Sequence, residues 1–201
     1  YEEVFKLQPN HYLELDLSSL DFAISPILQN LSKENYSDIT FKDAKKINHD
    51  LVIKSVESRS ISDVPIGTFL SGGVDSSIVS LCLSKINDNP IDTFSMGFEK
   101  KSFDESEKSQ LVAKLIGSKH HEFIVSNDNM ESFSNELILN YDEPFADSSA
   151  LPTYLISKLT RNSVKVALTG DGGDEVYGGY NKYYIGFLNQ KYKNIIPESI
   201  H

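Results

Sequence analysis

Apolar and amphipathic segments alternate along most of the chain. Short apolar runs rich in branched and aromatic side chains predict four buried strands, at 65–70, 91–97, 121–125 and 164–168. Apolar residues at spacings of three and four predict the helices, which end at Ile86 and Gly117, cover about 129–141 and 150–159, and begin again near Tyr180. Alternating strands and helices are typical of a parallel sheet covered on both faces. The pattern therefore predicts an α/β fold with three layers, α/β/α, and a mainly parallel central sheet.

The N-terminal part of the chain has a different pattern. Residues 12–17 alternate between apolar and polar and predict a strand, whereas residues 18–36 are polar and unpatterned and predict a linker. From about Ser37 the helical spacing appears, carried by Phe41, Ala44, Ile47, Leu51, Val52 and Val56. We therefore expect three parts: residues 1–17, a linker at 18–36, and an α/β domain over 37–201.

Composition narrows the classes of partner. The net charge is −10, and because nucleic acids bind basic surfaces, we expect no nucleic-acid partner. No apolar run approaches the length of about 18 residues that a membrane-spanning helix needs, so we expect no membrane span. Cys82 is the single cysteine, which excludes an internal disulfide and is typical of a reducing, cytoplasmic compartment.

The first candidate for chemistry is the segment Ser71-Gly-Gly-Val-Asp-Ser-Ser77, which follows a predicted strand and opens a predicted helix. Glycines let backbone amides approach a ligand, and the N-terminus of a helix favours an anion. The segment is therefore a candidate phosphate-binding loop. It is not a Walker A loop, because Gly73 stands where that motif requires lysine. Asp75 would repel a phosphate unless a cation lay between them, and Mg²⁺ suits that position.

A second loop, Thr169 to Tyr180, is also rich in glycine and follows another apolar strand. Its carboxylates Asp171, Asp174 and Glu175 repel one another, and a metal ion or a cationic partner would offset that repulsion. Ligands of such sheets bind at the carboxyl ends of strands, so we expect the two loops to meet there. Asp75 and Asp174 would then hold one Mg²⁺ ion.

Five sequence blocks carry a resemblance to a known family. They are, in chain order, Asp63–Ser77, Phe94–Phe98, Phe103–Ser106, Asp142–Ser149 and Leu168–Tyr180. The first block alone resembles the phosphate loop of the N-type ATP pyrophosphatases (PP-loop superfamily), which cut ATP between its α and β phosphates. The set together resembles the C-terminal synthetase domain of glutamine-hydrolysing asparagine synthetase. The resemblance implies an adenine nucleotide alpha-hydrolase-like fold for 37–201, and it implies that 1–17 is the tail of an N-terminal glutaminase domain.

The resemblance also implies a reaction, that of an amide-forming carbon–nitrogen ligase. In the family, the β-carboxylate of aspartate attacks the α-phosphate of ATP, giving β-aspartyl-AMP and pyrophosphate, and ammonia from glutamine then displaces AMP. The implied cofactors are ATP and Mg²⁺. The implied partners are small molecules, namely ATP, aspartate and ammonia, together with a second copy of the full-length protein in a homodimer.

Positions in the family motifs imply roles for individual residues. The implied ATP-binding residues are Leu70, Ser71, Gly72, Gly73, Asp75, Ser76, Ser77, Met96, Gly97, Thr169 and Gly170. The implied metal ligands are Asp75 and Asp174. Asp171 falls at the position implicated in forming the adenylate, where the best-known members have glutamate; the implied role is catalytic, and the shorter side chain leaves the identity of the carboxylate acceptor open.

Two parts of the family pattern are missing from the sequence. The glutaminase domain is represented only by its tail, where Leu7–Leu13 resembles its closing strand region. Cys82 lies in an apolar helix, where we expect it in the core and not as a substitute for that domain's cysteine nucleophile. The family's catalytic lysine would follow Asp174 at a distance that extends past His201. With Tyr1 in place of methionine, we expect a piece of a longer protein, and little or no synthesis from this chain alone.

Three other functions fit parts of the pattern. The closest alternative is an asparagine-synthetase-like amidotransferase that acts on another carboxylate, such as a sugar acid or a peptide. A tRNA-modifying ATP pyrophosphatase is disfavoured by the acidic charge and the single cysteine. A nucleotide-binding module without turnover is disfavoured by the presence of both Asp75 and Asp174.

Overall fold

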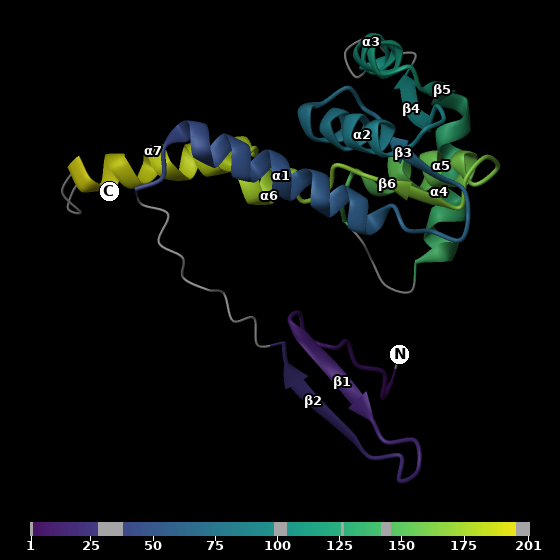
Figure 1. Ribbon diagram of the computed structural model, residues 1–201. Coiled ribbons are helices and arrows are strands. Elements are labelled where there is room, and N and C mark those ends of the chain that lie inside the picture. Colours follow the sequence, from purple (N-terminus) through teal and green to yellow (C-terminus); the bar gives the residue numbers. More distant parts are fainter. Residues whose placement is uncertain (1, 28–37, 99–103, 126, 142–145, 196–201) are drawn as a thin grey trace. The chain divides into compact units, whose positions relative to one another are not determined.

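The structure is a computed structural model that describes residues 2–27, 38–98, 104–125, 127–141 and 146–195 (Figure 1). The chain divides into two units, Tyr1–Ala44 and Lys45–His201. Helix α1 (Phe41–Arg59) begins in the first unit and continues into the second.

The first unit contains a two-stranded antiparallel sheet made of β1 (His11–Leu15) and β2 (Phe22–Pro26). Strand β1 confirms the strand predicted at 12–17, with slightly earlier bounds. Strand β2 lies where we predict an unpatterned linker, so that expectation is wrong at 22–26. Phe22 and Ile24 are 65% and 51% exposed. The strand is therefore formed by backbone pairing with β1 and not by burial of its side chains. Periodicity detects burial and therefore missed it.

The second unit is built on a four-stranded sheet in which every neighbouring pair is parallel. Its strands are β3 (Ile66–Phe69), β4 (Asp92–Phe98), β5 (Lys119–Val125) and β6 (Val166–Leu168). All four were predicted from their apolar runs. The order is β5-β4-β3-β6, so the chain moves outward from β3 to β5 and then returns to the other side of β3.

Helices cover both faces of this sheet and give the predicted three layers (Figure 1). Helices α2 (Val74–Ile86), α3 (Ser106–Ile116) and α5 (Ala150–Thr160) pack on its strands, and α4 (Asn127–Asn140) packs on α5. Helices α6 (Gly173–Tyr177) and α7 (Asn181–Ile195) follow β6 along the chain. On one face, Thr68 of β3 meets α2 through a bond of 2.7 Å between its Oγ1 and Ser80 Oγ. The next residue, Phe69, points the opposite way and lines a cavity with Ser157 and Thr160 of α5. The α/β/α architecture is therefore confirmed.

A hydrophobic core packs around the C-terminal half of α2 and fixes that part of the helix. It consists of Val56 from α1, Cys82 and Leu83 from α2, and Ile91 just before β4, each less than a tenth exposed. Burying one such aliphatic side chain contributes about 1.5–3 kcal/mol. Cys82 lies in this core as expected, and burial raises the pKa of its thiol.

Two local features complete the comparison with the sequence-based expectations. Helix α3 follows Asp104, whose carboxylate accepts bonds from the backbone N–H and the hydroxyl of Ser106, and it ends at Gly117 with φ +68, as predicted. The short helix α6 was not predicted, because five residues between glycines carry no helical periodicity. In the described residues no helix is both long and apolar enough to cross a membrane.

Candidate active site

The two glycine-rich loops follow neighbouring parallel strands. Strands β3 and β6 pair in parallel, with Thr68 opposite Leu168, so the loops that follow them leave the same edge of the sheet side by side. The strand order also reverses between β3 and β6, because the chain places β4 and β5 on one side of β3 and β6 on the other. Open parallel sheets bind ligands at the carboxyl ends of strands where the order reverses in this way. The topology therefore selects this edge for a ligand.

The first loop begins in the interior and ends at the surface. Leu70 is fully buried, and its backbone N–H bonds to the carbonyl of Phe94 (2.8 Å), which extends the strand pairing by one residue. Beyond it, the hydroxyl oxygens of Ser71 and Ser76 lie 3.0 Å apart. The Ser77 hydroxyl donates to the Gly73 carbonyl at 2.6 Å. These bonds close the loop onto the first turn of α2.

Gly72 lets the first loop pack directly against α3. Its φ is +82, and a Cβ at this position would lie 2.5 Å from the Cβ of Lys108 and 2.7 Å from the backbone nitrogen of Ser109. Both the conformation and the contact exclude a side chain. The loop is therefore held between the end of β3 and the start of α3.

The N-terminus of α2 has no side-chain cap. Gly73 occupies the N-cap position and provides no side-chain hydrogen bond to the first turn. The first-turn amides of a helix lack partners within the helix and carry partial positive charge. This end of α2, with the hydroxyls of Ser71, Ser76 and Ser77 around it, has the donor chemistry that phosphate oxygens accept.

The second loop is more open than the first. The Thr169 hydroxyl donates to the Asp171 carboxylate at 2.9 Å and holds it at the start of the loop. Tyr180 donates from its hydroxyl to Glu175 at 2.8 Å, and this bond raises the pKa of Tyr180 to about 12. Asp174, one residue into α6, folds its carboxylate against Gly179.

Glycines bring the second loop onto Asp75 of the first. A Cβ at Gly173 would lie 2.5 Å from the carboxyl carbon of Asp75, and a Cβ at Gly170 would lie 2.7 Å from the backbone nitrogen of Ser76. A larger residue at Gly170 would displace the backbone of the first loop, and one at Gly173 would push the Asp75 carboxylate aside. The structure thus brings Gly170 and Gly173 against Asp75 and Ser76, with Asp174 adjacent to Gly173 in the chain.

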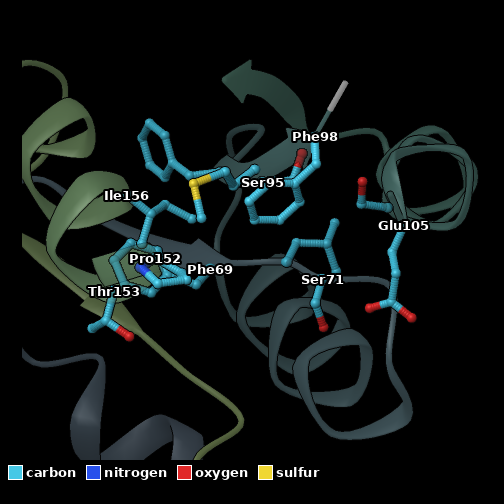
Figure 2. A pocket seen from close by; sticks show the side chains of 12 residues that line it. Phe69, Ser71, Ser95, Phe98, Glu105, Pro152, Thr153 and Ile156 are labelled. Atoms are coloured by element: carbon cyan, nitrogen blue, oxygen red, sulfur yellow. The ribbon is translucent and has the colours of Figure 1, made fainter. Parts of the chain in front are cut away.

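A cavity of about 290 Å³ opens beside the first loop (Figure 2). It is lined by Phe69, Leu70, Ser71, Phe94, Ser95, Met96, Phe98, Glu105, Ser109, Pro152, Thr153 and Ile156. In Figure 2, Ser71 and Glu105 lie on one side, and Pro152, Thr153 and Ile156 of α5 on the other. Three of the predicted ATP-binding residues, Leu70, Ser71 and Met96, therefore share one mostly apolar cavity.

Gly97 lies next to this cavity without lining it. A Cβ there would lie 3.2 Å from a carboxylate oxygen of Glu122 and 3.3 Å from one of Asp104. Bonds from the backbone N–H and hydroxyl of Ser106 lower the pKa of Asp104. Gly97 is thus packed between two carboxylates, and a side chain would disturb both.

Sequence reasoning missed the walls of the cavity that helices supply. Glu105 and Ser109 come from the start of α3, and Pro152, Thr153 and Ile156 come from α5. The block Phe103–Ser106 was a signal for the first of these, although no role was derived from it. Nothing in the sequence of α5 marks it as a cavity wall. Phe103 and residues 142–145 of the family blocks lie outside the described residues.

The two histidines of β5 form hydrogen bonds with side chains of the neighbouring strand β4. His120 meets the hydroxyls of Thr93 and Ser95 through its two ring nitrogens, at 2.9 and 3.1 Å, and burial lowers its pKa. His121 points the other way and meets Asp92 at 2.7 Å. They do not share a ligand.

The residues at the meeting point of the loops suit a magnesium ion that also binds phosphates. Among the described residues, no group of three or more His, Cys, Asp or Glu side chains is arranged to hold a metal by itself. Mg²⁺ commonly uses one or two carboxylates and completes its shell with water and substrate phosphates. Asp75 lies in the first turn of α2, whose N-terminus has no side-chain cap, and packs against Gly173 of the second loop. Its carboxylate fits that donor set.

Comparison with known proteins decides the family. The family model described as asparagine synthase matches residues 49–200, which include both loops and the cavity. The chain belongs to the asparagine synthase family. Its relatives include the putative asparagine synthetase [glutamine-hydrolyzing] 2 of Methanocaldococcus jannaschii, 35% identical over 195 residues, which are 93% of this chain and 36% of the relative. Asparagine synthetase [glutamine-hydrolyzing] 1 of Bacillus subtilis is 34% identical over 153 residues, 75% of this chain and 24% of the relative.

The chain matches only part of the length of its relatives in the asparagine synthase family. It spans 24% to 36% of the length of these two synthetases. Among solved structures, it resembles an NH3-dependent NAD synthetase from Campylobacter jejuni in complex with the nitrate ion, with 13% identity and a TM-score of 0.43 over 71% of this chain and 62% of that one. This last likeness is too distant to support a conclusion about function.

Proposed function

We propose that this chain carries the ATP-binding and adenylating site of an enzyme that amidates aspartate to asparagine, with glutamine as the source of ammonia. The observation that supports this most is the meeting of the two glycine-rich loops at the carboxyl edge of β3 and β6, where Gly170 and Gly173 press against Asp75 and Ser76. Family membership and the relatives' names support the choice of reaction.

In this proposal the nucleotide base enters the cavity lined by Leu70 and Met96, and the phosphates continue along the first loop. The uncapped amides at the start of α2 and the hydroxyls of Ser71, Ser76 and Ser77 donate to phosphate oxygens. On the other side, Thr169 and Gly170 of the second loop approach the same phosphates. Backbone and hydroxyl donors fixed before the nucleotide arrives cost little reorganisation, which is how a preorganised site stabilises developing charge.

The proposed chemistry has two steps. An oxygen of the substrate carboxylate attacks the α-phosphorus of ATP, and the bond from that phosphorus to the bridging oxygen breaks, so pyrophosphate leaves. Ammonia then attacks the activated acyl carbon, AMP leaves with the carboxylate oxygen, and a proton passes from nitrogen to solvent. Asp75 and Asp174 would hold a Mg²⁺ ion, which when bound supplies positive charge to the leaving pyrophosphate.

Asp171 bears on which carboxylate is amidated. Its carboxylate is fixed by the Thr169 hydroxyl at the start of the second loop, within the proposed phosphate region. The best-known synthetases carry the longer glutamate here, so a carboxylate other than aspartate is the second candidate acceptor. An amidotransferase that acts on a sugar acid or a peptide carboxylate would use the same phosphate site.

A substrate panel on the full-length protein tests the proposal. The protein is supplied with Mg²⁺, ATP and ammonium, and AMP and pyrophosphate are measured with aspartate, glutamate, a uronic acid or an acidic peptide. The proposal predicts AMP and pyrophosphate in equal amounts, dependent on aspartate. Equal amounts that depend on another carboxylate would favour the second acceptor. Release of ADP and phosphate, or no turnover with any carboxylate, would contradict the adenylating site.

A further inference from the structure

The two loops that meet at the sheet edge are acidic. Residues 71–77 and 169–180 contain four carboxylates, Asp75, Asp171, Asp174 and Glu175, and no lysine or arginine. A polyphosphate brings further negative charge to this place. One divalent ion between two of the carboxylates leaves part of that charge without a partner. A cation from another element would be needed beside the first loop.

Helix α3 places a lysine directly on the first loop. The Cβ of Lys108 would be 2.5 Å from a Cβ at Gly72, closer than any other atom that such a Cβ would meet. The absence of a side chain at Gly72 is what permits this contact, and its φ of +82 also favours glycine. The stem of Lys108 therefore starts against the proposed phosphate loop, although it is 36 positions away in sequence.

The ammonium group of Lys108 pairs with a residue that lines the cavity. It pairs with Glu105 at 2.9 Å, and Glu105 lines the cavity together with Ser71 (Figure 2). The two side chains are 65% and 52% exposed, so water screens the pair and it is easily broken. Lysine has a long flexible stem and acts as a point charge that follows a phosphate without fixed geometry.

We propose that Lys108 is a phosphate-binding residue of this site, whose ammonium leaves Glu105 to pair with the polyphosphate of the bound nucleotide. The inference rests on the proposed ATP site. It gives that site the cation that its own loops lack, supplied by α3 through the contact with Gly72. Glu105 then acts as the resting partner of Lys108 and competes with the ligand for it.

Equilibrium dialysis of Mg·ATP and of adenosine against the full-length protein tests this role. Lys108→Met should weaken ATP binding about tenfold, the usual worth of a charge-assisted bond, and leave adenosine binding within twofold. Lys108→Arg should keep ATP binding within about threefold, since the charge remains. Glu105→Gln should strengthen ATP binding by about twofold, because the ammonium loses its competing partner. Lys114→Met, which removes an equal charge from the last turn of the same helix, should change neither ligand.

The outcomes separate this inference from the proposed function. If the unaltered protein binds Mg·ATP and Lys108→Met binds it equally well, the role of Lys108 is wrong and the site stands. An equal loss for ATP and adenosine would also overturn it, because the lysine would then support the fold of the cavity. Lys108→Gln repeats the measurement if the methionine variant does not fold. If the unaltered protein binds no ATP, both the proposed function and the role of Lys108 fail.

Discussion

The two glycine-rich loops have similar compositions but are held in different ways. In the first, Leu70 is fully buried and Gly72 is pressed against α3, so packing fixes the backbone before any ligand arrives. In the second, Gly172 and Gly178 have φ of +91 and +69 with nothing within 4 Å of a Cβ, so only local conformation requires glycine there. The site therefore pairs a rigid loop with an open loop that touches it at Gly170 and Gly173.

The largest effect expected from this difference is on stability. Gly72→Ala must place a side chain at φ +82 and displace α3, at a cost of about 2–5 kcal/mol in the free energy of unfolding. Gly178→Ala meets only the conformational penalty, about 1–2 kcal/mol. Urea denaturation of both variants measures the difference. Equal costs would mean that the first loop is no better packed than the second.

A smaller effect tests the anchor below the first loop. Thr68 on β3 and Ser80 on α2 are both fully buried and share a hydrogen bond of 2.7 Å. Ser80→Ala leaves the Thr68 hydroxyl buried without that partner and should cost about 1–3 kcal/mol. The double variant Thr68→Val with Ser80→Ala removes both polar groups and should recover most of this loss. A double variant less stable than Ser80→Ala, measured by urea denaturation, would show that the pair is not an isolated polar contact.

The smallest effect belongs to the open loop. Glu175 raises the pKa of Tyr180 to about 12 by accepting a hydrogen bond from its hydroxyl. A raised pKa in the folded state means that this contribution to stability is complete below pH 10 and is lost as the pH rises through 12. Glu175→Gln should return the pKa of Tyr180 toward its ordinary value of about 10, followed by NMR of ring-labelled tyrosine. An unchanged pKa would mean that the loop does not hold this pair in solution.

The sequence predicts the sheet and its helices because their burial leaves a periodic signal. The runs around Phe69, Phe94 and Leu168 are short and apolar, and each forms a strand. Strand β2 leaves no such signal because its apolar side chains stay exposed when it pairs with β1. Helix α6 leaves none because it is only five residues long. The position of both loops at strand ends followed from the same reading.

The arrangement of the site could be predicted only in part. The rule that ligands bind at strand ends predicts one shared edge, but the pairing of β6 with β3 depends on long-range topology that no local pattern encodes. The same limit applies to Pro152 and Ile156, which line the cavity because α5 packs across β4. The contact of Lys108 with Gly72 joins two elements and is visible only in three dimensions. The roles of Asp75 and Asp174 are predictions that the following variants test.

A double-mutant cycle on Asp75 and Asp174 tests the shared-ion account most directly. The measured quantity is the affinity of the full-length protein for ATP at saturating and at zero Mg²⁺, for Asp75→Asn, Asp174→Asn and the double variant, with Asp88→Asn past the other end of α2 as control. If both carboxylates hold one ion, each single variant loses most of the Mg²⁺-dependent affinity and the double variant loses little more. Losses that add independently, or a single variant that keeps the full Mg²⁺ effect, would contradict the shared ion on which the proposed adenylation depends.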